Sequence, residues 1–302
     1  MKRIIRIFLV SIISFIPFSG KGQNMHLIDS LESIAKTAPK DTNLLHVLFQ
    51  LNNQYRVFNP DSAMEKCQEA LLLSQQLKFN RGIGKAYLNI ATILRRKGEN
   101  AQAITYQLKA LGYFEALGDR GSIAKVYGNM GITYWQQGNL KQALVFYEKA
   151  LNIDLELKNK VGISAGYNNI GGLYNEQKQF EKALEYYFKS MQMDEGVKDI
   201  EGLSNTYGNI GITYALLGNY TESSKYQLKC IELCKRIGNK SSLASAYINI
   251  GGVYAKNGNY HGALNSLDTG LKIAAQLNYK DGIKNAYKCY AETYTSNGDY
   301  KS

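Results

Sequence analysis

Apolar residues recur at helical spacing along most of the chain, in blocks that repeat every 40 residues. In one block, Ile83, Tyr87, Ile90 and Leu94 follow one another at intervals of four, three and four, which places them on one face of a helix. A second apolar stripe follows over about 100–117. The pattern therefore predicts one pair of helices, a first and a second, in each block.

Small and polar residues mark the ends of these helices. Gly98 closes the first helix of its block, and glycine tolerates the left-handed backbone that ends a helix. The same stop recurs at Gly138, Gly218, Gly258 and Gly298, and Lys178 takes its place in one block. The residues that follow four of these glycines are good N-caps: Asn139, Asn219, Asn259 and Asp299.

Small residues also recur inside the helices, in one block at Gly131, Ala143 and Ala150 and in the next at Gly171 and Ala183. A glycine inside a helix costs about 1 kcal/mol relative to alanine. We therefore expect these positions to lie where two helices cross closely.

One polar residue occupies the same place in five blocks, within segments such as VYGNMGITY and TYGNIGITY. These residues form the asparagine ladder: Asn89, Asn129, Asn169, Asn209 and Asn249. A period held without slippage over five copies is typical of a solenoid, in which each unit contacts its neighbours in one elongated body.

The motif residues resemble those of the tetratricopeptide repeat; they are Tyr127, Met130, Gly131, Tyr134, Gly138, Ala143, Tyr147 and Ala150. The 40-residue length is similar to the repeats of kinesin light chains and cell-polarity adaptors. The resemblance covers about 41–302 and implies an all-α, right-handed superhelical solenoid of antiparallel helix pairs. We place units near 41–80, 81–120, 121–160, 161–200, 201–240 and 241–280, with a partial unit at 281–302.

Both ends of the chain depart from the repeat. The unit 41–80 is degenerate, since Phe49 stands at the ladder position, and 23–40 is expected to form a helical cap with a short amphipathic helix over 28–38. At the other end, Gly298 and Asp299 predict the start of a second helix shortly before Ser302. Either the last helix serves as a cap or the solenoid continues in a longer protein.

The N-terminus has the features of a secretory signal. Lys2, Arg3 and Arg6 precede an apolar stretch of about a dozen residues, too short for a membrane span of roughly 20. We expect a signal peptide over 1–22 with cleavage after Gly22, which makes the protein exported, either periplasmic or secreted. The alternative is an uncleaved membrane anchor. Cleavage removes four of the 36 basic residues and none of the 25 acidic ones, so the net charge falls from +11 to +7.

Catalysis finds little support in the sequence. The three histidines, His26, His46 and His261, are far apart and not in metal-ligand spacing, and no nucleophile motif occurs. The four cysteines are better explained by core packing than by disulfides, because Cys230 replaces a small residue of the repeat. We therefore expect no enzyme, no metal and no cofactor.

The asparagine ladder is the best candidate for a binding site. Lys85, Asn89, Thr92 and Arg96 share one face of a first helix. The resemblance implies that first helices line a concave groove and that these asparagines contact peptide backbone, for which an amide offers both a donor and an acceptor. The alternative is that each asparagine bonds within the stack.

Glycines flank the ladder in alternate units, at Gly128 and Gly208 and at Gly172 and Gly252. Glycine lets a ligand backbone approach closely. The alternative is a two-unit duplication without functional content.

Positive charge gathers at the N-terminal end of the ladder, where Lys85, Arg95, Arg96 and Lys125 cluster with Trp135 nearby. An acidic group or a C-terminal carboxylate would suit this end, although a solvated basic face is the alternative. The modest charge of an exported chain argues against a nucleic-acid partner.

The sequence thus predicts an exported scaffold that binds an extended peptide or protein segment in its groove. A second hypothesis is the sensor ectodomain of a signalling protein whose histidine kinase, nucleotide cyclase or DNA-binding output lies elsewhere. A third is a purely structural spacer. Membrane contact is expected only if the signal is uncleaved or a further span follows.

Overall fold

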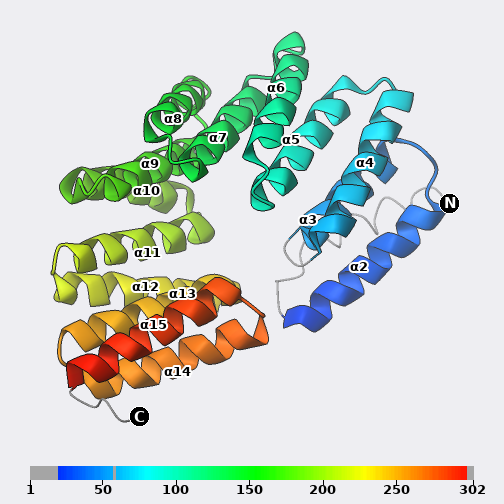
Figure 1. Ribbon diagram of the computed structural model, residues 1–302. Coiled ribbons are helices and arrows are strands. Elements are labelled where there is room, and N and C mark those ends of the chain that lie inside the picture. Colours follow the sequence, from blue (N-terminus) through cyan, green and yellow to red (C-terminus); the bar gives the residue numbers. More distant parts are fainter. Residues whose placement is uncertain (1–19, 57–58, 298–302) are drawn as a thin grey trace. The chain divides into compact units, whose positions relative to one another are not determined.

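The computed structural model describes residues 20–56 and 59–297, with side chains from Met25 onward, and these residues form α-helices joined by short turns (Figure 1). The helices are α2 (Gly20–Thr37), α3 (Thr42–Tyr55), α4 (Pro60–Gln76), α5 (Asn80–Arg96), α6 (Asn100–Ala116), α7 (Arg120–Gln136), α8 (Leu140–Glu156), α9 (Lys160–Glu176), α10 (Phe180–Val197), α11 (Ile200–Leu216), α12 (Tyr220–Ile237), α13 (Lys240–Lys256), α14 (Tyr260–Gln276) and α15 (Lys280–Asn297).

The chain divides into two parts. Of the described residues, 26–226 form the N-terminal part, and 227–297 together with 20–25 form the C-terminal part. Within the described residues no strand occurs, which agrees with the all-α solenoid expected from the repeat.

The first helices α5, α7, α9, α11 and α13 end at the residues that the sequence predicts. Gly98 has a φ of 84° and Lys178, at the equivalent turn, has a φ of 59°, so the lysine adopts the same left-handed backbone as the glycine. The N–H of Glu99 bonds back to the carbonyl of Leu94 over 2.9 Å, which satisfies a carbonyl that the helix leaves unpaired. Gly298 and Asp299 lie outside the described residues.

The predicted N-caps hold the next helix. The Oδ1 atoms of Asn139, Asn219 and Asn259 accept hydrogen bonds from backbone N–H groups three residues further on. Pro60 opens α4 with Asn59 as its cap. Local sequence therefore decides where these helices start.

The small-residue positions lie at close helix crossings, as expected. A Cβ atom built on Gly131 of α7 would lie 2.5 Å from the ring of Tyr147 on α8, and one on Gly171 would lie 2.8 Å from the ring of Tyr187 on α10. Ala143 and Ala183 are fully buried. Both rings pack directly on helix backbone, which a larger residue would prevent.

Stacked tyrosines extend this packing within each helix pair. Tyr134 stacks on Phe146 with ring centroids 5.3 Å apart, and Tyr127 meets the same ring at 5.9 Å. The next pair repeats the arrangement with Tyr174 and Tyr167 around Tyr186, at 5.4 and 6.1 Å. Aromatic pairs at such distances contribute about 0.5–1.5 kcal/mol beyond area burial. The repeat thus accounts for much of the tyrosine content.

The N-terminal helix packs on the degenerate unit. Ile28 and Leu31 of α2 are buried against Val47 and Leu51 of α3. The hydroxyl of Tyr55 donates to Glu32 over 3.1 Å. The helix is longer than the expected 28–38: it begins at Gly20, ahead of the predicted cleavage point after Gly22. The rest of the predicted signal peptide, 1–19, lies outside the described residues.

The C-terminal part closes on its own small core. Leu267 of α14 packs on Gly251 of α13, where an added Cβ would lie 2.7 Å from the leucine. Ile248 of α13 and Ala286 of α15 complete the cluster. None of the helices, over the residues described, is long and apolar enough to span a bilayer.

Candidate functional site: an amide pocket and a basic cluster

The five ladder asparagines all lie on first helices, from α5 to α13, and all are half-buried. The Nδ2 of Asn129 donates to the carbonyl of Lys125 in its own helix over 2.8 Å. The Nδ2 of Asn209 donates to Oδ1 of Asn168 on α9 over 2.7 Å. Asn249 belongs to the C-terminal part. The ladder is therefore not uniform, because each amide meets different neighbours.

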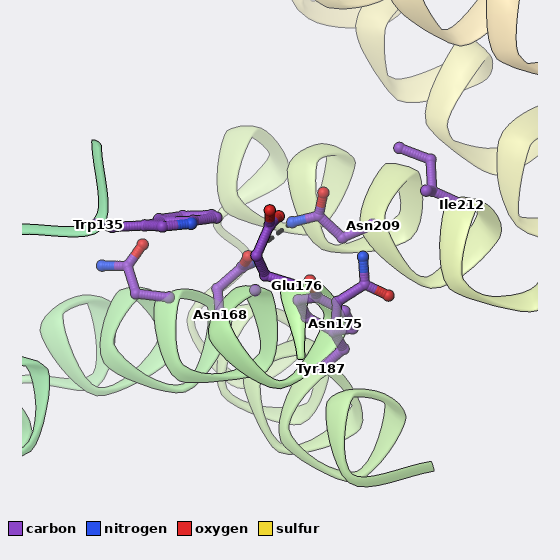
Figure 2. Close-up of a pocket in the computed structure, with 9 residues that line it drawn as sticks. Trp135, Asn168, Asn175, Glu176, Tyr187, Asn209 and Ile212 are labelled. Carbon is purple, nitrogen blue, oxygen red and sulfur yellow. Dashed lines mark hydrogen bonds between the residues drawn. The ribbon is translucent and has the colours of Figure 1, made fainter. Parts of the chain in front are cut away.

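A pocket of about 230 Å³ opens where α7, α9 and α11 meet (Figure 2). It brings together Asn169, Asn209 and Trp135 of the expected site, while Asn89, Asn129, Asn249, Lys85, Arg96 and Lys125 are not among its lining residues. The remaining lining residues are Asn168, Gly172, Asn175, Glu176, Tyr187 and Ile212. Four amides and one indole thus share one small cavity, and we call it the amide pocket.

The indole of Trp135 lies against the backbone of α9. A Cβ atom built on Gly172 would lie 3.1 Å from the ring, so the glycine makes room for tryptophan. In the C-terminal part, a Cβ atom built on Gly252 would lie 3.6 Å from the Sγ of Cys289, an ordinary van der Waals contact, and nothing lies within 4 Å of a Cβ on Gly128. Among these three glycines, the close packing therefore requires glycine only at Gly172.

A chain of hydrogen bonds leads from the amide pocket into the interior. Asn209 donates to Asn168, the Nδ2 of Asn168 donates to Oγ1 of Thr206 over 2.7 Å, and Thr206 donates to Oδ2 of Asp194 over 3.1 Å. Ser190 lies 3.1 Å from Thr206. Thr206 and Asp194 are both fully buried. A carboxylate in the core is thereby linked to a side chain of the pocket.

Asp194 sits where the first turn of α11 passes over the end of α10. A Cβ atom on Gly202 would lie 2.7 Å from its Oδ1, so the close approach requires glycine there. Burial raises the pKa of Asp194 above its usual value, and the hydroxyls of Ser164 and Thr206 oppose that shift. The N-terminal end of α11 also favours a negative charge at this point.

Asp154 occupies the same place one unit earlier. It is buried against Gly162 of α9, and burial likewise raises its pKa, while a hydrogen bond from Asn159 opposes the shift. Its partner, the Nδ2 of Asn159, donates over 2.7 Å. Asp154 therefore shares the burial of Asp194 but bonds to a turn residue instead of a threonine on the pocket side.

Three arginines lie at the ends of α3 and α5, and we call Arg56, Arg95 and Arg96 the basic cluster. Arg56 and Arg95 are half-buried, and the Nε atom of each is buried without a hydrogen-bond partner. None of the three forms an ion pair with a described residue. Burial and the positive charge of Arg96 lower the pKa of both Arg56 and Arg95. The cluster thus holds charge that the stack itself does not neutralise.

Lys85 lies with its Nζ 4.3 Å from the ring centroid of Phe49 on α3, a cation–π contact. The residue as a whole is exposed, but partial desolvation of its ammonium group lowers its pKa, and the charges of Lys125 and Arg81 lower it further. Phe49, which occupies the ladder position of the degenerate unit, therefore serves as a platform for a lysine of the next one.

Two family models match the chain. The model described as "Tetratricopeptide repeat" matches residues 82–156, 162–236 and 202–276, which together exceed half of the chain. The chain belongs to the tetratricopeptide repeat family. The model described as the SusR N-terminal TPR domain matches residues 21–108. No curated protein sequence matches at significant similarity.

Solved structures show the same repeat fold at low identity. A Rap protein complexed with competence and sporulation factor has a TM-score of 0.63 and 13% identity, over 91% of this chain and 88% of that one. A STAND ATPase with a tetratricopeptide repeat sensor, from Pyrococcus horikoshii, has a TM-score of 0.62 and 17% identity, over 89% of this chain and 42% of that one. A putative kinesin light chain with TPR-like repeats, from Podosopora anserina, has a TM-score of 0.50 and 13% identity, over 64% of this chain and 95% of that one.

Sequence reasoning missed several residues of this tetratricopeptide site. Asn168 stands in a column held by Leu88, Gly128 and Gly208 in other units, and that break was the available signal. Asp194 stands in a column that holds Phe114 and Cys234 in other units, and Thr206 stands in one that holds Val126 and Ala246. A polar residue in a core column was the available signal. The contact between Asp194 and Thr206 depends on how α10 and α11 pack.

In the described part of the chain, the cysteines and acidic residues form no disulfide and no metal site. The Sγ atoms of Cys230 and Cys234 are 3.8 Å apart, well beyond the S–S bond length of about 2.05 Å. Burial raises the pKa of Cys67 to about 12, so its thiol is unreactive at neutral pH. Among the residues that carry described side chains, no group of three metal-ligating residues occurs.

Proposed function

We propose that this tetratricopeptide repeat chain is a binding scaffold, not an enzyme, and that it takes an extended peptide or protein segment along the first-helix side of its N-terminal part. The observation that carries the proposal is the amide pocket. Asn168, Asn169, Asn175 and Asn209 surround one cavity beside the indole of Trp135. Amides bind peptide N–H and C=O groups irrespective of the peptide's side chains, and an indole offers a flat apolar surface.

The basic cluster supports a preference for an acidic group at one end of that segment. Arginine binds carboxylates through paired N–H donors. A ligand carboxylate at Arg56, Arg95 and Arg96 would relieve a repulsion that the described residues leave uncompensated. Lys85 and Lys125 extend the positive field along the same ladder. The ligand that fits is therefore an extended segment with an acidic side chain or a C-terminal carboxylate.

Asn169→Ala tests the pocket most directly. The side chain of Asn169 makes no hydrogen bond to another described residue, so its loss should leave the melting temperature within about 2 °C of the wild type. Peptides are selected from a random linear library on the full chain, and their affinity is measured by calorimetry. We expect a loss of about fivefold or more, since one ligand hydrogen bond is worth roughly 1 kcal/mol.

Asn152→Ala is the matched control, because Asn152 is an exposed asparagine on α8, a second helix. It should change neither affinity nor melting temperature. Trp135 supplies an independent readout, since it is the single tryptophan of the chain and lines the pocket. If the selected peptides leave the fluorescence of Trp135 unchanged and bind Asn169→Ala as tightly as the wild type, the pocket is not part of the binding site.

A second candidate function, the ectodomain of a sensor, is favoured by the match of residues 21–108 to a SusR N-terminal TPR domain. The relevant test is the gene itself. A reading frame that continues past Ser302 into a hydrophobic span and a kinase, cyclase or DNA-binding domain would establish this function. A stop codon directly after Ser302 would favour the scaffold that acts without an output domain. A spacer, in contrast, would select no peptide at all.

Export belongs to the proposal as well, on the basis of Lys2, Arg3 and Arg6 and the apolar stretch behind them. Mass spectrometry of the mature protein should find Gln23 at its N-terminus. Because α2 begins at Gly20, cleavage after Gly22 would remove three residues of that helix and leave its buried Ile28 and Leu31 in place. A mature chain that retains Arg3 would indicate an anchor.

A further inference from the structure

The hydrogen-bond chain that ends at Asp194 has a fixed direction. At pH values above its pKa, Asp194 is an ionised carboxylate, which accepts hydrogen bonds and has no proton to give. Thr206 has a single hydroxyl proton, and its Oγ1 lies 3.1 Å from Oδ2 of Asp194. Thr206 therefore donates to Asp194, and towards every other neighbour its oxygen can act as an acceptor.

The same constraint passes outward to the pocket. Since Thr206 accepts, the group of Asn168 that faces it at 2.7 Å must be the NH₂ group. The oxygen of Asn168 then faces Asn209, which must present its own NH₂ group across the 2.7 Å contact. The Oδ1 of Asn209 is left on the other side of its amide, and Figure 2 shows it turned away from Asn168.

The serines beside the chain agree with this direction. Ser190 lies 3.1 Å from Thr206, and Ser164 lies 2.9 Å from Ser190. With its proton committed to Asp194, Thr206 can accept from both Asn168 and Ser190, which uses its two lone pairs. Ser164 can in turn donate to Ser190 or directly to Asp194. Every proton in the cluster can thus point towards Asp194 without conflict.

We propose that Asp194 is a positioning residue which sets the polarity of the amide pocket, so that Asn209 offers its oxygen and selects a ligand group with an N–H donor. This inference rests on the proposed binding of a peptide at the pocket. The donor that fits an extended segment is a backbone N–H, and a side-chain amide or ammonium group has the same donor chemistry. A ligand that presents a carbonyl or a carboxylate at this point is disfavoured.

The polarity can be tested on the protein without a ligand. The scalar coupling across the hydrogen bond from Nδ2 of Asn209 to the side-chain carbonyl carbon of Asn168 should be detectable by NMR in the isotope-labelled full chain. In Asp194→Asn, position 194 gains an NH₂ group that can donate to Thr206, so the chain can reverse. The coupling should weaken by half or more, and the reciprocal coupling, from Asn168 to Asn209, should appear.

Asp154→Asn is the matched control, because Asp154 has the same place in the repeat and similar burial but bonds to Asn159. It should leave the Asn209 coupling unchanged. If the wild type shows the reciprocal coupling, or if Asp194→Asn leaves the coupling intact, the inference is wrong whether or not any peptide binds. The wild-type measurement decides the direction even if Asp194→Asn fails to fold.

Peptides selected from a random linear library on the full chain then test the donor preference. Replacing one backbone amide after another by an ester removes single N–H groups. One such replacement should weaken binding about fivefold or more to the wild type and by less than about twofold to Asp194→Asn. If only a change of a peptide asparagine, glutamine or lysine side chain has this effect, the donor is a side chain.

Thr206 supplies a rescue pair for the same assay. Thr206→Val keeps the shape and breaks the chain, so the ester replacement should weaken binding by less than about twofold, as in Asp194→Asn. Thr206→Ser restores the hydroxyl and should keep the wild-type sensitivity to that replacement. A donor scan that is identical in wild type, Thr206→Val and Asp194→Asn overturns the inference even though peptides bind. If the library yields no binding peptide, the proposed function and the ligand preference are both overturned. The NMR measurement then still decides the polarity of the hydrogen-bond chain.

Discussion

The basic cluster and the amide pocket occupy equivalent columns of the repeat and differ in chemistry. Arg95 at the end of α5 corresponds to Asn175 at the end of α9, two units later, and Arg96 corresponds to Glu176. In the basic cluster, charges meet without a described partner. In the pocket, amides and hydroxyls bond to one another. The fold fixes the place of a side chain, and its neighbours decide what it offers a ligand.

This difference predicts two kinds of dependence. Binding at the basic cluster should respond to ionic strength, because long-range Coulomb attraction is screened by salt. Binding at the pocket should respond to geometry, because a hydrogen bond weakens steeply when its distance or angle changes. Perturbing one region should therefore leave the signature of the other intact, unless the shared scaffold itself is broken.

The largest expected effect comes from breaking that scaffold. Gly131→Leu on α7 would force a side chain into the ring of Tyr147, where even a Cβ lies at 2.5 Å. We expect a loss of about 3 kcal/mol or more, in the range of severe overpacking, with both binding signatures lost together. Thermal or urea unfolding measures the stability. Gly128→Ala on the same helix has nothing within 4 Å of its new Cβ and should be neutral or slightly stabilising.

Removing the charges should separate the two regions. In a variant with Arg56, Arg95 and Arg96 all changed to glutamine, affinity for acidic peptides should fall about tenfold or more and its salt dependence should flatten. The melting temperature should rise or stay level, because half-buried charges that repel one another are lost. Calorimetry at two salt concentrations and a melting curve provide the measurement.

A charge-matched variant controls for net charge. Changing Lys109, Lys141 and Lys149, all on second helices, to glutamine also removes three positive charges, but away from the basic cluster. If that variant loses the same salt dependence, the field of the whole protein is responsible and the local cluster is not.

Asp194 gives a prediction about pH. Its folded-state pKa is raised, so the native state binds a proton more tightly than the unfolded chain does. The corresponding stability is present below the unfolded pKa and is lost as pH rises through the higher folded pKa. Asp194→Asn should flatten this decline between acidic and neutral pH. Urea unfolding across that range measures it, and Glu201→Gln, an exposed acid on α11, should follow the wild-type curve.

The smallest expected effect is at Gly172. Gly172→Ala places a Cβ 3.1 Å from the indole of Trp135, so the ring must shift by a few tenths of an ångström. Stability should change by less than about 1 kcal/mol, since alanine also favours the helix, while the emission of the single tryptophan should shift. Gly112→Ala, which has nothing within 4 Å, should leave the emission unchanged. An unshifted spectrum for Gly172→Ala would mean that the indole does not rest on α9.

Helix boundaries, turns and close crossings could be predicted from the sequence because they depend on local chemistry. Gly98 and Lys178 end helices through their own backbone conformation, and Asn139 caps a helix three residues away. Gly131 indicated a close helix crossing, because glycine destabilises a helix and its presence there is explained by packing. The period of 40 repeated these signals in most units, although Glu99 and Gln179 replace the N-cap asparagine and Ala91 replaces the glycine of the crossing.

The polarity of the candidate site depends on contacts that the repeat period does not encode. Asn209 and Asn129 share a column, yet one bonds across to α9 and the other to its own helix. The difference arises because Asn168 replaces a glycine or leucine of other units, and Thr206 connects it to a carboxylate on α10. Sequence by itself determined where each side chain stands along its helix. Tertiary packing decided which lone pairs and protons are already used, because a hydrogen bond forms only between groups that the packed helices bring within about 3 Å.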